Sequence, residues 1–441
     1  MTAAEAESHL SPEELLEAWP VLSRDERTEG FSLLPRHAAE DVFYGLSGRD
    51  AMQLIMSLPF SERRSWIRLL EPDDVADVIQ EAPVDERDGL FSLLDDLTRK
   101  EVAALMAYAE DDAGGLMSPR YARVRPDMTV DEALAYLRKQ ARGRIETIYY
   151  AYVLDAQQKL LGVVTFRELF AAEGKDKVRD IMKTEVLTIA EDLDQEGVSR
   201  RFAQHGFIAM PVVDADGRMK GIVTHDDIVE VVEEEATEDI QKMGGTEALD
   251  APYMTVGFWE MIKKRGSWLS ILCVGEMLTA TAMAYFEGEL KRAAVLMLFV
   301  PLIISSGGNS GSQASTLVIR ALALGEVRLR DWWRVVRREL AAGLALGAVL
   351  GTLGFVRIVV WQSIGHVYGD HWLLIGGTIF IALVGVVLFG TLAGSMLPFV
   401  LRTLKLDPAS ASAPFVATLV DVSGLVIYFT VASLVLSGTL L

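Results

Sequence analysis

Cysteine and histidine are scarce in this chain, whose 441 residues include one cysteine and six histidines. The single cysteine, Cys273, excludes a disulfide within the chain and a zinc site made of several thiolates. So few histidines and cysteines also argue against a dedicated zinc or copper centre. The first residues, MTAAEAESHLSPEE, contain no basic segment and no apolar run, so we expect no cleaved signal peptide.

Positive charge is scarce in the first 262 residues, which contain 28 Lys and Arg residues against 53 Asp and Glu residues. The resulting net charge of −25 repels phosphate and argues against nucleic acid as the main partner. Residues 263–441 are far more apolar and contain 14 basic and 9 acidic residues. The sequence therefore joins an acidic part to an apolar part, and its apolar content excludes a disordered chain.

Five long apolar runs in the second part predict five membrane spans, because about 20 apolar residues cross the hydrocarbon core of a bilayer. The runs cover residues 268–286, 293–323, 339–361, 372–400 and 411–438. If the spans alternate in direction, one side collects eleven basic residues: Lys263, Lys264, Arg265, Arg320, Arg328, Arg330, Arg334, Arg337, Arg338, Arg402 and Lys405. The other side has only Lys291, Arg292 and Arg357. This bias predicts a cytoplasmic amino-terminal part and a carboxyl terminus outside the cell.

The second apolar run contains a polar, glycine-rich segment, SSGGNSGSQAST, at residues 305–316. We expect non-helical backbone there, facing protein or water, because lipid cannot satisfy free backbone polar groups. Freed carbonyls, together with Asn309 and Gln313, would then offer oxygen ligands to an ion. The alternative is a close helix crossing made of small residues, which explains the glycines but not the two amide side chains.

Two carboxyl groups within the spans are candidates for ion binding. Asp421 lies in the middle of the last span, among small residues at helical spacing that include Ala417 and Thr418. A carboxylate at membrane depth costs about 2.5 kcal/mol or more, which favours a functional role over a protonated or salt-bridged structural aspartate. Glu276, in the first span, is either a second ligand or an ion-pair partner.

The chain from residue 10 to residue 108 is predicted to be helical. Pro35, Pro59 and Pro83 recur at intervals of 24 residues, and each is followed by polar residues and then by apolar residues at helical spacing. Proline is favoured where a helix begins. A short fixed period predicts stacked helical hairpins that form a small solenoid.

Residues 115–235 contain a duplication. Three pairs of positions lie 59 residues apart: Asp155 and Asp214, Gly162 and Gly221, and Thr165 and Thr224. Each copy predicts a strand, a helix, two strands joined by a polar turn, and a closing helix. This pattern resembles a CBS-domain pair, which implies sensing of a small ligand rather than catalysis.

The end of each copy resembles the nucleotide-contacting motif of CBS domains, in which a threonine precedes an acidic residue by three positions. In the first copy these residues are Thr165 and Glu168. By this resemblance Arg167, Glu168 and Phe207 are candidates for contacts to a nucleotide such as ATP. Glu168 stands where the motif usually has a ribose-binding aspartate, which weakens the expectation for the first copy.

An acidic helix is expected from Ile228 to Ala251, directly before the first span. Its carboxylates are neighbours at three and four residues, so they repel one another. A solvated acidic face is the simplest explanation of such a run. Its position, together with the acidic segments GRD at 48–50 and EPDDVAD at 71–77, favours instead a hard divalent cation, which prefers oxygen ligands.

Over nearly the whole chain, the order of solenoid, CBS pair, acidic helix and five spans resembles the MgtE family of magnesium channels. The matching segments are DDAGGLMSPRY (111–121), RIETIYYAYVLD (144–155), EEEATEDI (233–240), PLIISSGGNSGSQASTLVIRALALGE (301–326) and APFVATLVDVSGLVIYF (413–429). The resemblance implies a homodimer in the lipid bilayer with one ion path on its two-fold axis. The second and fifth spans would line this path, and Asp421 of both chains would hold a largely hydrated Mg2+.

The resemblance also assigns acids that bind regulatory Mg2+ and close the pore through the acidic helix: Glu40, Asp73, Asp77, Glu196, Asp227, Glu230, Glu235, Glu238 and Asp239. The sequence departs from the family pattern at three positions. Gly206 replaces an expected aspartate in the second CBS copy, and Ala413 stands where an asparagine can precede the proline at the inner mouth of the pore. Glu276 is unusual for the first span. These departures concern gating and selectivity rather than the class of protein.

We therefore predict a multidomain protein with an all-α solenoid, an α+β CBS pair and an α-helical membrane domain. The expected parts are residues 1–112, CBS copies at 113–180 and 181–235, a connecting helix at 236–265 and a membrane domain at 266–441. The expected function is Mg2+ uptake through a channel of the plasma (inner) membrane that cytoplasmic Mg2+ closes. An enzyme is not expected, because the sequence contains no nucleophile–base pair, phosphate loop or HExxH motif. The alternatives are transport that extends to Co2+, Mn2+ and Ni2+, proton-coupled transport through Asp421 or Glu276, and a CBS-regulated anion channel.

Overall fold

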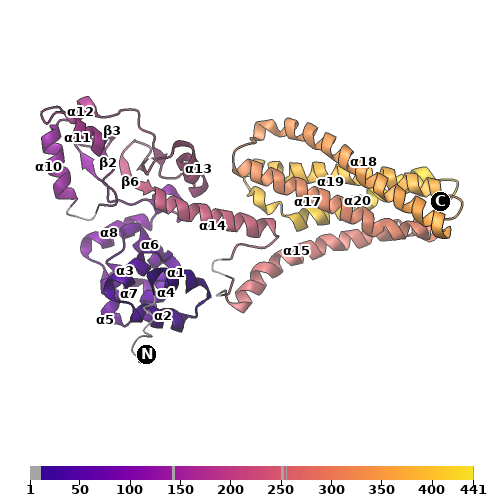
Figure 1. Ribbon diagram of the computed structural model, residues 1–441, viewed down its shortest axis with the longest axis horizontal. Helices are drawn as coiled ribbons and strands as arrows, with labels where there is room; N and C mark the ends of the chain where they lie inside the picture. The colour runs from indigo at the N-terminus through magenta and orange to yellow at the C-terminus, as the bar shows by residue number, and fades with distance from the viewer. Residues whose placement is uncertain (1–10, 142–144, 250–252, 255, 441) are drawn as a thin grey trace, which may run out of the picture. The chain divides into compact units, whose positions relative to one another are not determined.

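The computed structural model describes residues 11–141, 145–249, 253–254 and 256–440 (Figure 1). In its first part helices begin every twelve residues. They are α1 (Pro12–Ala18), α2 (Arg24–Leu33), α3 (Arg36–Tyr44), α4 (Gly48–Ser57), α5 (Phe60–Ile67), α6 (Pro72–Glu81), α7 (Val84–Leu93) and α8 (Asp96–Leu105), with a short 3-10 turn, η1 (Trp19–Val21). The 24-residue period of the sequence therefore corresponds to two helices, and the predicted helical repeat is confirmed.

The residue before each helix explains where the helix starts. A side chain accepts a hydrogen bond from the first turn of α1, α2, α4 and α8, and these caps are Ser11, Ser23, Ser47 and Asp95. The residues before α3, α5 and α7 are Pro35, Pro59 and Pro83. Proline disfavours a helical conformation in the residue before it and removes a backbone donor, so it separates one helix from the next.

One apolar core connects these helices to the second CBS copy. Phe43, Ile67 and Ile79 are fully buried within it, and the same cluster of contacts includes Ile189 and Val223 of the second copy. The structure divides the chain into two units at residues 235 and 236, so the helical repeat and the CBS pair form one unit.

Each CBS copy contains a three-stranded sheet within the described residues, with a parallel and then an antiparallel pairing. The strands are β1 (Arg123–Val124), β2 (Tyr150–Leu154) and β3 (Leu160–Thr165), then β4 (Ile189–Ala190), β5 (Ala209–Val213) and β6 (Met219–Thr224). The helices of this region are α9 (Ala113–Leu116), α10 (Val130–Gln140), α11 (Phe166–Ala171), α12 (Val178–Ile181), α13 (Gln195–His205) and α14 (His225–Met243). The predicted order of elements in each copy is confirmed.

The paired glycines of the duplication mark where the two copies exchange backbone contacts. A side-chain carbon at Gly162 would lie 2.7 Å from the carbonyl oxygen of Lys183, and one at Gly221 would lie 2.7 Å from that of Ser118. Each glycine therefore allows a backbone segment from outside its own sheet to approach. Val163 bonds to Lys183 in both directions beside the first glycine, as Ser118 does to Ile222 beside the second.

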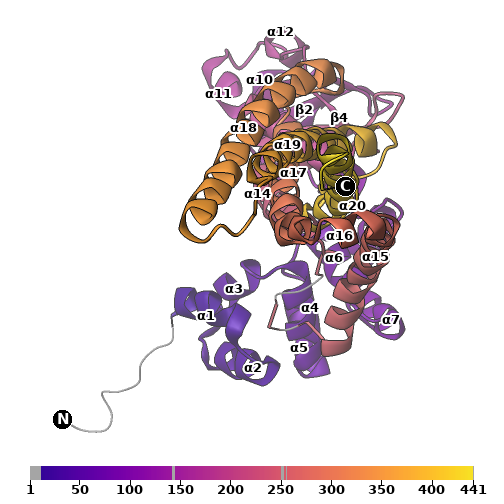
Figure 2. The same ribbon diagram turned by 90° about the vertical axis from the view of Figure 1, so that its right-hand side faces the viewer.

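Five helices in the described part of the chain are long and apolar enough to cross a membrane. They are α15 (Phe258–Tyr285), α17 (Val300–Ala323) with the preceding turn η2 (Ala294–Phe299), α18 (Trp332–Gly365) with the turn η3 (Leu329–Asp331), α19 (Trp372–Thr403) and α20 (Ala413–Leu436). Two short elements, α16 (Glu287–Arg292) and η4 (Pro408–Ser410), connect them. Figure 2 looks nearly along α17, α19 and α20, which pack side by side. The predicted fold class is confirmed.

The expectation of non-helical backbone at residues 305–316 is wrong, because α17 continues as a helix through this segment. Its glycines serve close helix packing instead. A side-chain carbon at Gly311 would lie 2.9 Å from the carbonyl oxygen of Gly390 on α19 and 2.8 Å from Val416 Cγ1 on α20. The backbone carbonyls of this segment are therefore engaged in helix formation, and only its side chains remain as candidate ligands.

Candidate cation sites in the acidic and membrane parts

Asp73 on α6 is a buried carboxyl group beside other carboxyl groups of the first unit. Its side chain is 8% exposed, and its Oδ1 atom has no hydrogen-bond partner among the residues that the structure describes. Burial raises the pKa of Asp73 well above its usual range, and the negative charges of Asp227, Asp74 and Glu146 raise it further. A buried carboxylate oxygen without a partner is costly, so this position favours a cation or a proton.

Asp77, one turn further along α6, extends the same acidic cluster. Burial raises the pKa of Asp77, and the nearby charges of Asp74, Glu110 and Glu230 raise it further. Gly48 packs directly on it, since a side-chain carbon at Gly48 would lie 2.9 Å from Asp77 Cβ. The two acidic segments at 48–50 and 71–77 are therefore neighbours. Asp50 of the first segment is already paired, with its Oδ1 atom 2.8 Å from Arg27 Nη1.

Two further members of the cluster come from the CBS pair. Asp227, at the start of α14, accepts hydrogen bonds at 3.0 Å from the Thr224 backbone N–H and at 2.6 Å from the Thr224 hydroxyl. Glu146 lies just before β2 and accepts a hydrogen bond from the Ser118 hydroxyl at 3.1 Å. Burial and the charges of Glu71 and Asp227 raise the pKa of Glu146 to about 7.

Sequence reasoning missed Glu146 and Glu110 as members of the acidic cluster, and it indicated Asp74 only as part of the acidic segment at 71–77. Glu146 stands alone in the motif RIETIYY, remote in sequence from the acidic runs, so only its family motif could have indicated it. The cluster is also not a closed ligand cage. Within the described residues, no group of three or more histidine, cysteine, aspartate or glutamate side chains is arranged to hold a metal ion.

Four of the other predicted sensor acids already have partners in their own part of the chain. Glu40 pairs with Arg36 at 2.7 Å, and Glu196 pairs with Arg200 at 3.2 Å. Glu235 accepts a hydrogen bond from Gln195 at 2.7 Å. Glu238 pairs with Lys242. Glu230 on α14 interacts with the cluster around Asp73 through Asp74 and Asp227. Asp239 lies further along α14, in its last two turns.

The candidate nucleotide residues lie at the end of the first copy and beside α13. Glu168 forms a capping box with Thr165 and pairs with Lys183 at 2.8 Å, so both of its oxygens have partners within the chain. Arg167 is exposed on α11, and Phe207 stacks on His205 with ring centres 5.8 Å apart.

Two of the three departures from the family pattern have structural explanations. Gly206 ends α13 with a φ of 64°, a left-handed conformation that glycine adopts without strain. Ala413 begins α20, and its carbonyl oxygen accepts a hydrogen bond from the Ser312 hydroxyl at 3.0 Å. The α17–α20 contact at this position therefore uses the backbone of residue 413 rather than its side chain.

Asp421 lies on α20 where this helix packs against α17. A side-chain carbon at Gly308 would lie 3.4 Å from Ala417 Cβ and 3.7 Å from Asp421 Oδ1, so the glycine brings the α17 backbone close to the carboxylate. Asp421 is half-buried within the chain. Asn309 and Gln313 are exposed on α17, and Asn309 donates a hydrogen bond to the Ser305 hydroxyl at 3.3 Å.

Glu276 of α15 lies beside Asp421 of α20, where the two helices pack closely, since a side-chain carbon at Gly275 would lie 2.6 Å from Thr418 Cγ2. The helices run side by side in the same direction. Trp268 contacts Phe415, with ring centres 6.4 Å apart, and further along both helices Phe286 stacks on Phe429 at 5.1 Å. The structure therefore brings together the two intramembrane carboxyl groups that the sequence singles out.

Three family models match this chain. The MgtE intracellular N domain matches residues 10–111, the CBS domain matches residues 113–175 and 178–234, and the MgtE divalent cation transporter model matches residues 300–431. Together these ranges cover the helical repeat, both CBS copies and most of α17 to α20.

Named relatives match over most of the chain. The magnesium transporter MgtE of Thermus thermophilus is 41% identical over 432 residues, which are 97% of this chain and 94% of that protein. The magnesium transporter MgtE of Bacillus subtilis is 33% identical over 364 residues, which are 82% of this chain and 78% of that protein. A crystal structure of the cytosolic domain of the Mg2+ channel MgtE in complex with ATP shares 41% identity, covers 51% of this chain and 91% of that chain, and has a TM-score of 0.47. The chain belongs to the MgtE family of divalent cation transporters.

Proposed function

We propose that this protein is a homodimeric channel that carries Mg2+ across the membrane, and that Mg2+ bound to its acidic unit closes it. The observation that carries the proposal is the 41% identity, over 97% of the chain, with a magnesium transporter of the same family. The same relationship favours the plasma (inner) membrane, with the acidic unit in the cytoplasm and the carboxyl terminus outside. The unequal distribution of Lys and Arg around the spans supports that orientation.

Asp421 is the residue that we assign to ion binding in the pore. Mg2+ loses its water reluctantly, so a wide site of carboxylate and amide oxygens suits a largely hydrated ion. Asp421 is partly exposed on α20, and Asn309 and Gln313 are exposed on the neighbouring helix α17. In a dimer, two copies of Asp421 would attract the ion without enclosing it, and conduction requires binding that is not too tight.

The acidic cluster around Asp73 is the site that we assign to sensing. Its carboxylates repel one another when no cation is present, so the arrangement in which they face each other is favoured by bound Mg2+. The unpartnered Oδ1 atom of Asp73 supports this assignment. Because the carboxylates do not form a closed cage, the ion would keep several of its waters, as Mg2+ usually does.

Uptake into liposomes that contain the purified protein tests the transport proposal directly. Mg2+ uptake should be abolished or strongly reduced in both Asp421→Asn and Asp421→Ala. The asparagine keeps an oxygen but loses the negative charge, and the alanine loses both. Asp370→Asn, in the connection between α18 and α19, is the matched control and should transport normally. Normal uptake by both Asp421 variants would remove this residue from the pore site.

Transport of a wider set of divalent ions is the alternative for selectivity. Competition by Co2+, Mn2+ and Ni2+ in the same liposomes distinguishes the two possibilities. Proton-coupled transport is a second candidate mechanism, favoured by the contact between Glu276 and Asp421. It predicts that a proton gradient drives Mg2+ accumulation when the membrane potential is clamped at zero, whereas a channel passes Mg2+ only down its own electrochemical gradient.

We also propose that the CBS pair binds a nucleotide such as ATP near Arg167, Glu168 and Phe207. The spacing of Thr165 and Glu168 supports it, because a threonine three residues before an acidic residue resembles the nucleotide-contacting motif of CBS domains. Calorimetric titration of the full-length protein with ATP, compared with the Phe207→Ala variant, tests this assignment.

A further inference from the structure

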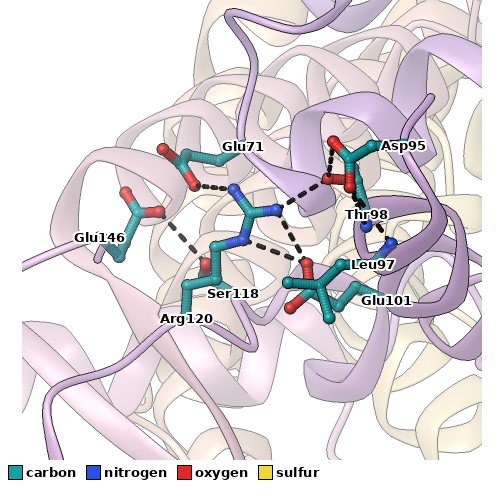
Figure 3. A network of polar contacts seen from close by, with 8 residues as sticks. All are labelled: Glu71, Asp95, Leu97, Thr98, Glu101, Ser118, Arg120 and Glu146. Atoms are coloured by element: carbon teal, nitrogen blue, oxygen red, sulfur yellow. Dashed lines mark hydrogen bonds and ion pairs between the residues drawn. The ribbon is translucent and has the colours of Figure 1, made fainter. Parts of the chain in front are cut away.

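Arg120 joins the amino-terminal helices to the CBS pair through four hydrogen bonds (Figure 3). It lies on the segment between α9 and β1, which leads into the first CBS copy. Its Nε and Nη2 atoms donate to Glu101 Oε2 on α8 at 3.1 and 2.8 Å. Its Nη1 atom donates to Glu71 Oε2 at 3.2 Å, and Nη2 also donates to the Thr98 hydroxyl at 3.0 Å.

The environment of Arg120 makes these contacts stronger than ordinary surface ion pairs. The side chain of Arg120 is 10% exposed, and those of Glu101 and Glu71 are 21% and 28% exposed. Charge-assisted hydrogen bonds in such a partly buried position are shorter and stronger than neutral ones, and the rigid guanidinium group suits several acceptors at once. Thr98, which accepts a hydrogen bond from Arg120, donates its backbone N–H and its hydroxyl to Asp95. The Thr98 hydroxyl is therefore held in place.

The segment that carries Arg120 also holds one side of the acidic cluster. The backbone N–H of Glu146 donates to the Arg120 carbonyl oxygen at 2.9 Å, and Ser118 binds the Glu146 carboxylate. Glu71, the partner of Arg120, directly precedes α6, which carries Asp73. The contact between the helices and the CBS pair therefore has two adjacent halves. In one half an arginine neutralises the carboxylates, and in the other the negative charges of Asp227 and Glu146 act on the buried Asp73, without a basic partner in between among the described residues.

We propose that Arg120 is a built-in cation that holds the amino-terminal helices on the CBS pair without a metal ion, and that it thereby sets the Mg2+ concentration at which the sensor closes. This inference rests on the proposed sensing function. Mg2+ would then need to neutralise only the carboxylates around Asp73, which Arg120 does not bind. A partly assembled site binds its ligand more tightly, because less of the binding free energy is used to bring the two parts together.

Limited digestion of the full-length protein with chymotrypsin tests this inference, since this protease does not require the arginine that the variant removes. Cleavage within residues 106–122 reports separation of the helices from the CBS pair. Without Mg2+, Arg120→Ala should be cleaved about tenfold faster than the wild type, and the Mg2+ concentration for half-protection should rise about tenfold. Arg125→Ala is the matched control, because Arg125 is 68% exposed and pairs only with the equally exposed Asp127 among the described residues.

A charge exchange separates the role of Arg120 from a general loss of folding. The double variant Arg120→Glu with Glu101→Arg should regain much of the Mg2+-free protection that Arg120→Glu alone loses. Equal cleavage of Arg120→Ala and wild type without Mg2+, with equal half-protection concentrations, would overturn the inference. Failure of the double variant to recover any protection would also overturn it.

The same experiment keeps the two proposals distinguishable. If Mg2+ does not protect the wild type, the sensing function fails, whatever the effect of Arg120→Ala. If Mg2+ protects the wild type and Arg120→Ala at the same concentration, sensing stands and the role of Arg120 fails.

Discussion

Lys242 and Asp407 form an ion pair, with Nζ 2.7 Å from Oδ2, that fastens the last turn of α14 to the connection between α19 and α20. The next residue, Met243, packs against the cluster that contains Ile319 and Ala409. Asp407 also accepts a hydrogen bond from the backbone N–H of Ala409 at 2.8 Å, which fixes its orientation. The carboxyl-terminal end of α14 is therefore held by the membrane domain, in the same unit.

Loss of the Lys242 charge should loosen this attachment. Lys242→Met keeps the length of the side chain but removes its ion pairs with Asp407 and Glu238. Partly exposed ion pairs contribute up to about 1 kcal/mol, so the Mg2+ concentration for half-closure should rise by a few-fold. Channel currents against internal Mg2+ measure this shift.

Lys291→Met is the matched control for Lys242→Met. Lys291 also pairs with a glutamate four residues away, Glu287, but it is 73% exposed on α16. Its loss should leave the half-closure concentration unchanged. An equal shift in both variants would mean that overall charge, rather than the contact at Asp407, determines closure.

Asp73→Asn should weaken the response to Mg2+ while preserving the fold. The amide has nearly the same shape, and it removes the buried charge that Asp227, Asp74 and Glu146 repel. The first unit of this variant should therefore resist proteolysis better than the wild type when no Mg2+ is present. Added Mg2+ should change its rate of cleavage by about tenfold or less.

Asp88→Asn serves as the control for Asp73→Asn, because Asp88 is exposed on α7. It should respond to Mg2+ as the wild type does. If Asp73→Asn kept the full Mg2+ response, the regulatory ion would have to bind elsewhere in the chain.

The sequence predicts the elements well because each carries a local signal. The prolines at 24-residue intervals, the 59-residue duplication and the five apolar runs depend only on residues close together in the chain. The error at residues 305–316 has a physical reason. Glycine and serine disfavour a helix in isolation, but on α17 they allow α19 and α20 to approach, and the packing outweighs the low propensity.

The site was harder to predict because its members come from distant segments. Asp73 and Asp227 are adjacent to acidic runs that sequence reasoning could identify, whereas Glu146 and Arg120 lie in segments without such a run. No local pattern shows that Glu40 and Glu196 are paired with arginines one helical turn away rather than with the cluster. The contact between Glu276 and Asp421 likewise depends on the packing of α15 against α20.

The Mg2+ concentration needed for protection should fall as the pH rises from about 6 to about 8. The pKa of Glu146 is raised to about 7, so over this range Glu146 retains a proton that Mg2+ must displace, and burial raises the pKa of the neighbouring Asp73 in the same direction. A carboxyl group whose pKa is higher in the folded protein than in the unfolded chain stabilises the fold when it is protonated. This stabilisation is complete below the unfolded-state pKa of about 4, and it is lost as the pH rises through the folded-state pKa of about 7.

Metal-free protein should therefore become more susceptible to proteolysis over the same rise in pH, whereas protein saturated with Mg2+ should change little. Digestion at a series of pH values, with a chelator or with excess Mg2+, measures both effects. A half-protection concentration that does not depend on pH would show that these carboxyl groups do not bind the ion.

Close packing at Gly311 should be essential to the membrane domain. In Gly311→Ala the added carbon would lie 2.8 Å from Val416 Cγ1 and 2.9 Å from the Gly390 carbonyl oxygen, so α17 must move away from α19 and α20. Such overpacking costs about 1–3 kcal/mol and should lower the melting temperature of the detergent-solubilised protein by several degrees, with loss of Mg2+ uptake. Gly377→Ala on α19 is the control, because a carbon there meets no atom within 4 Å in the described structure, and alanine favours the helix. If Gly311→Ala melted and transported like Gly377→Ala, the three helices would not pack as closely as the structure has them.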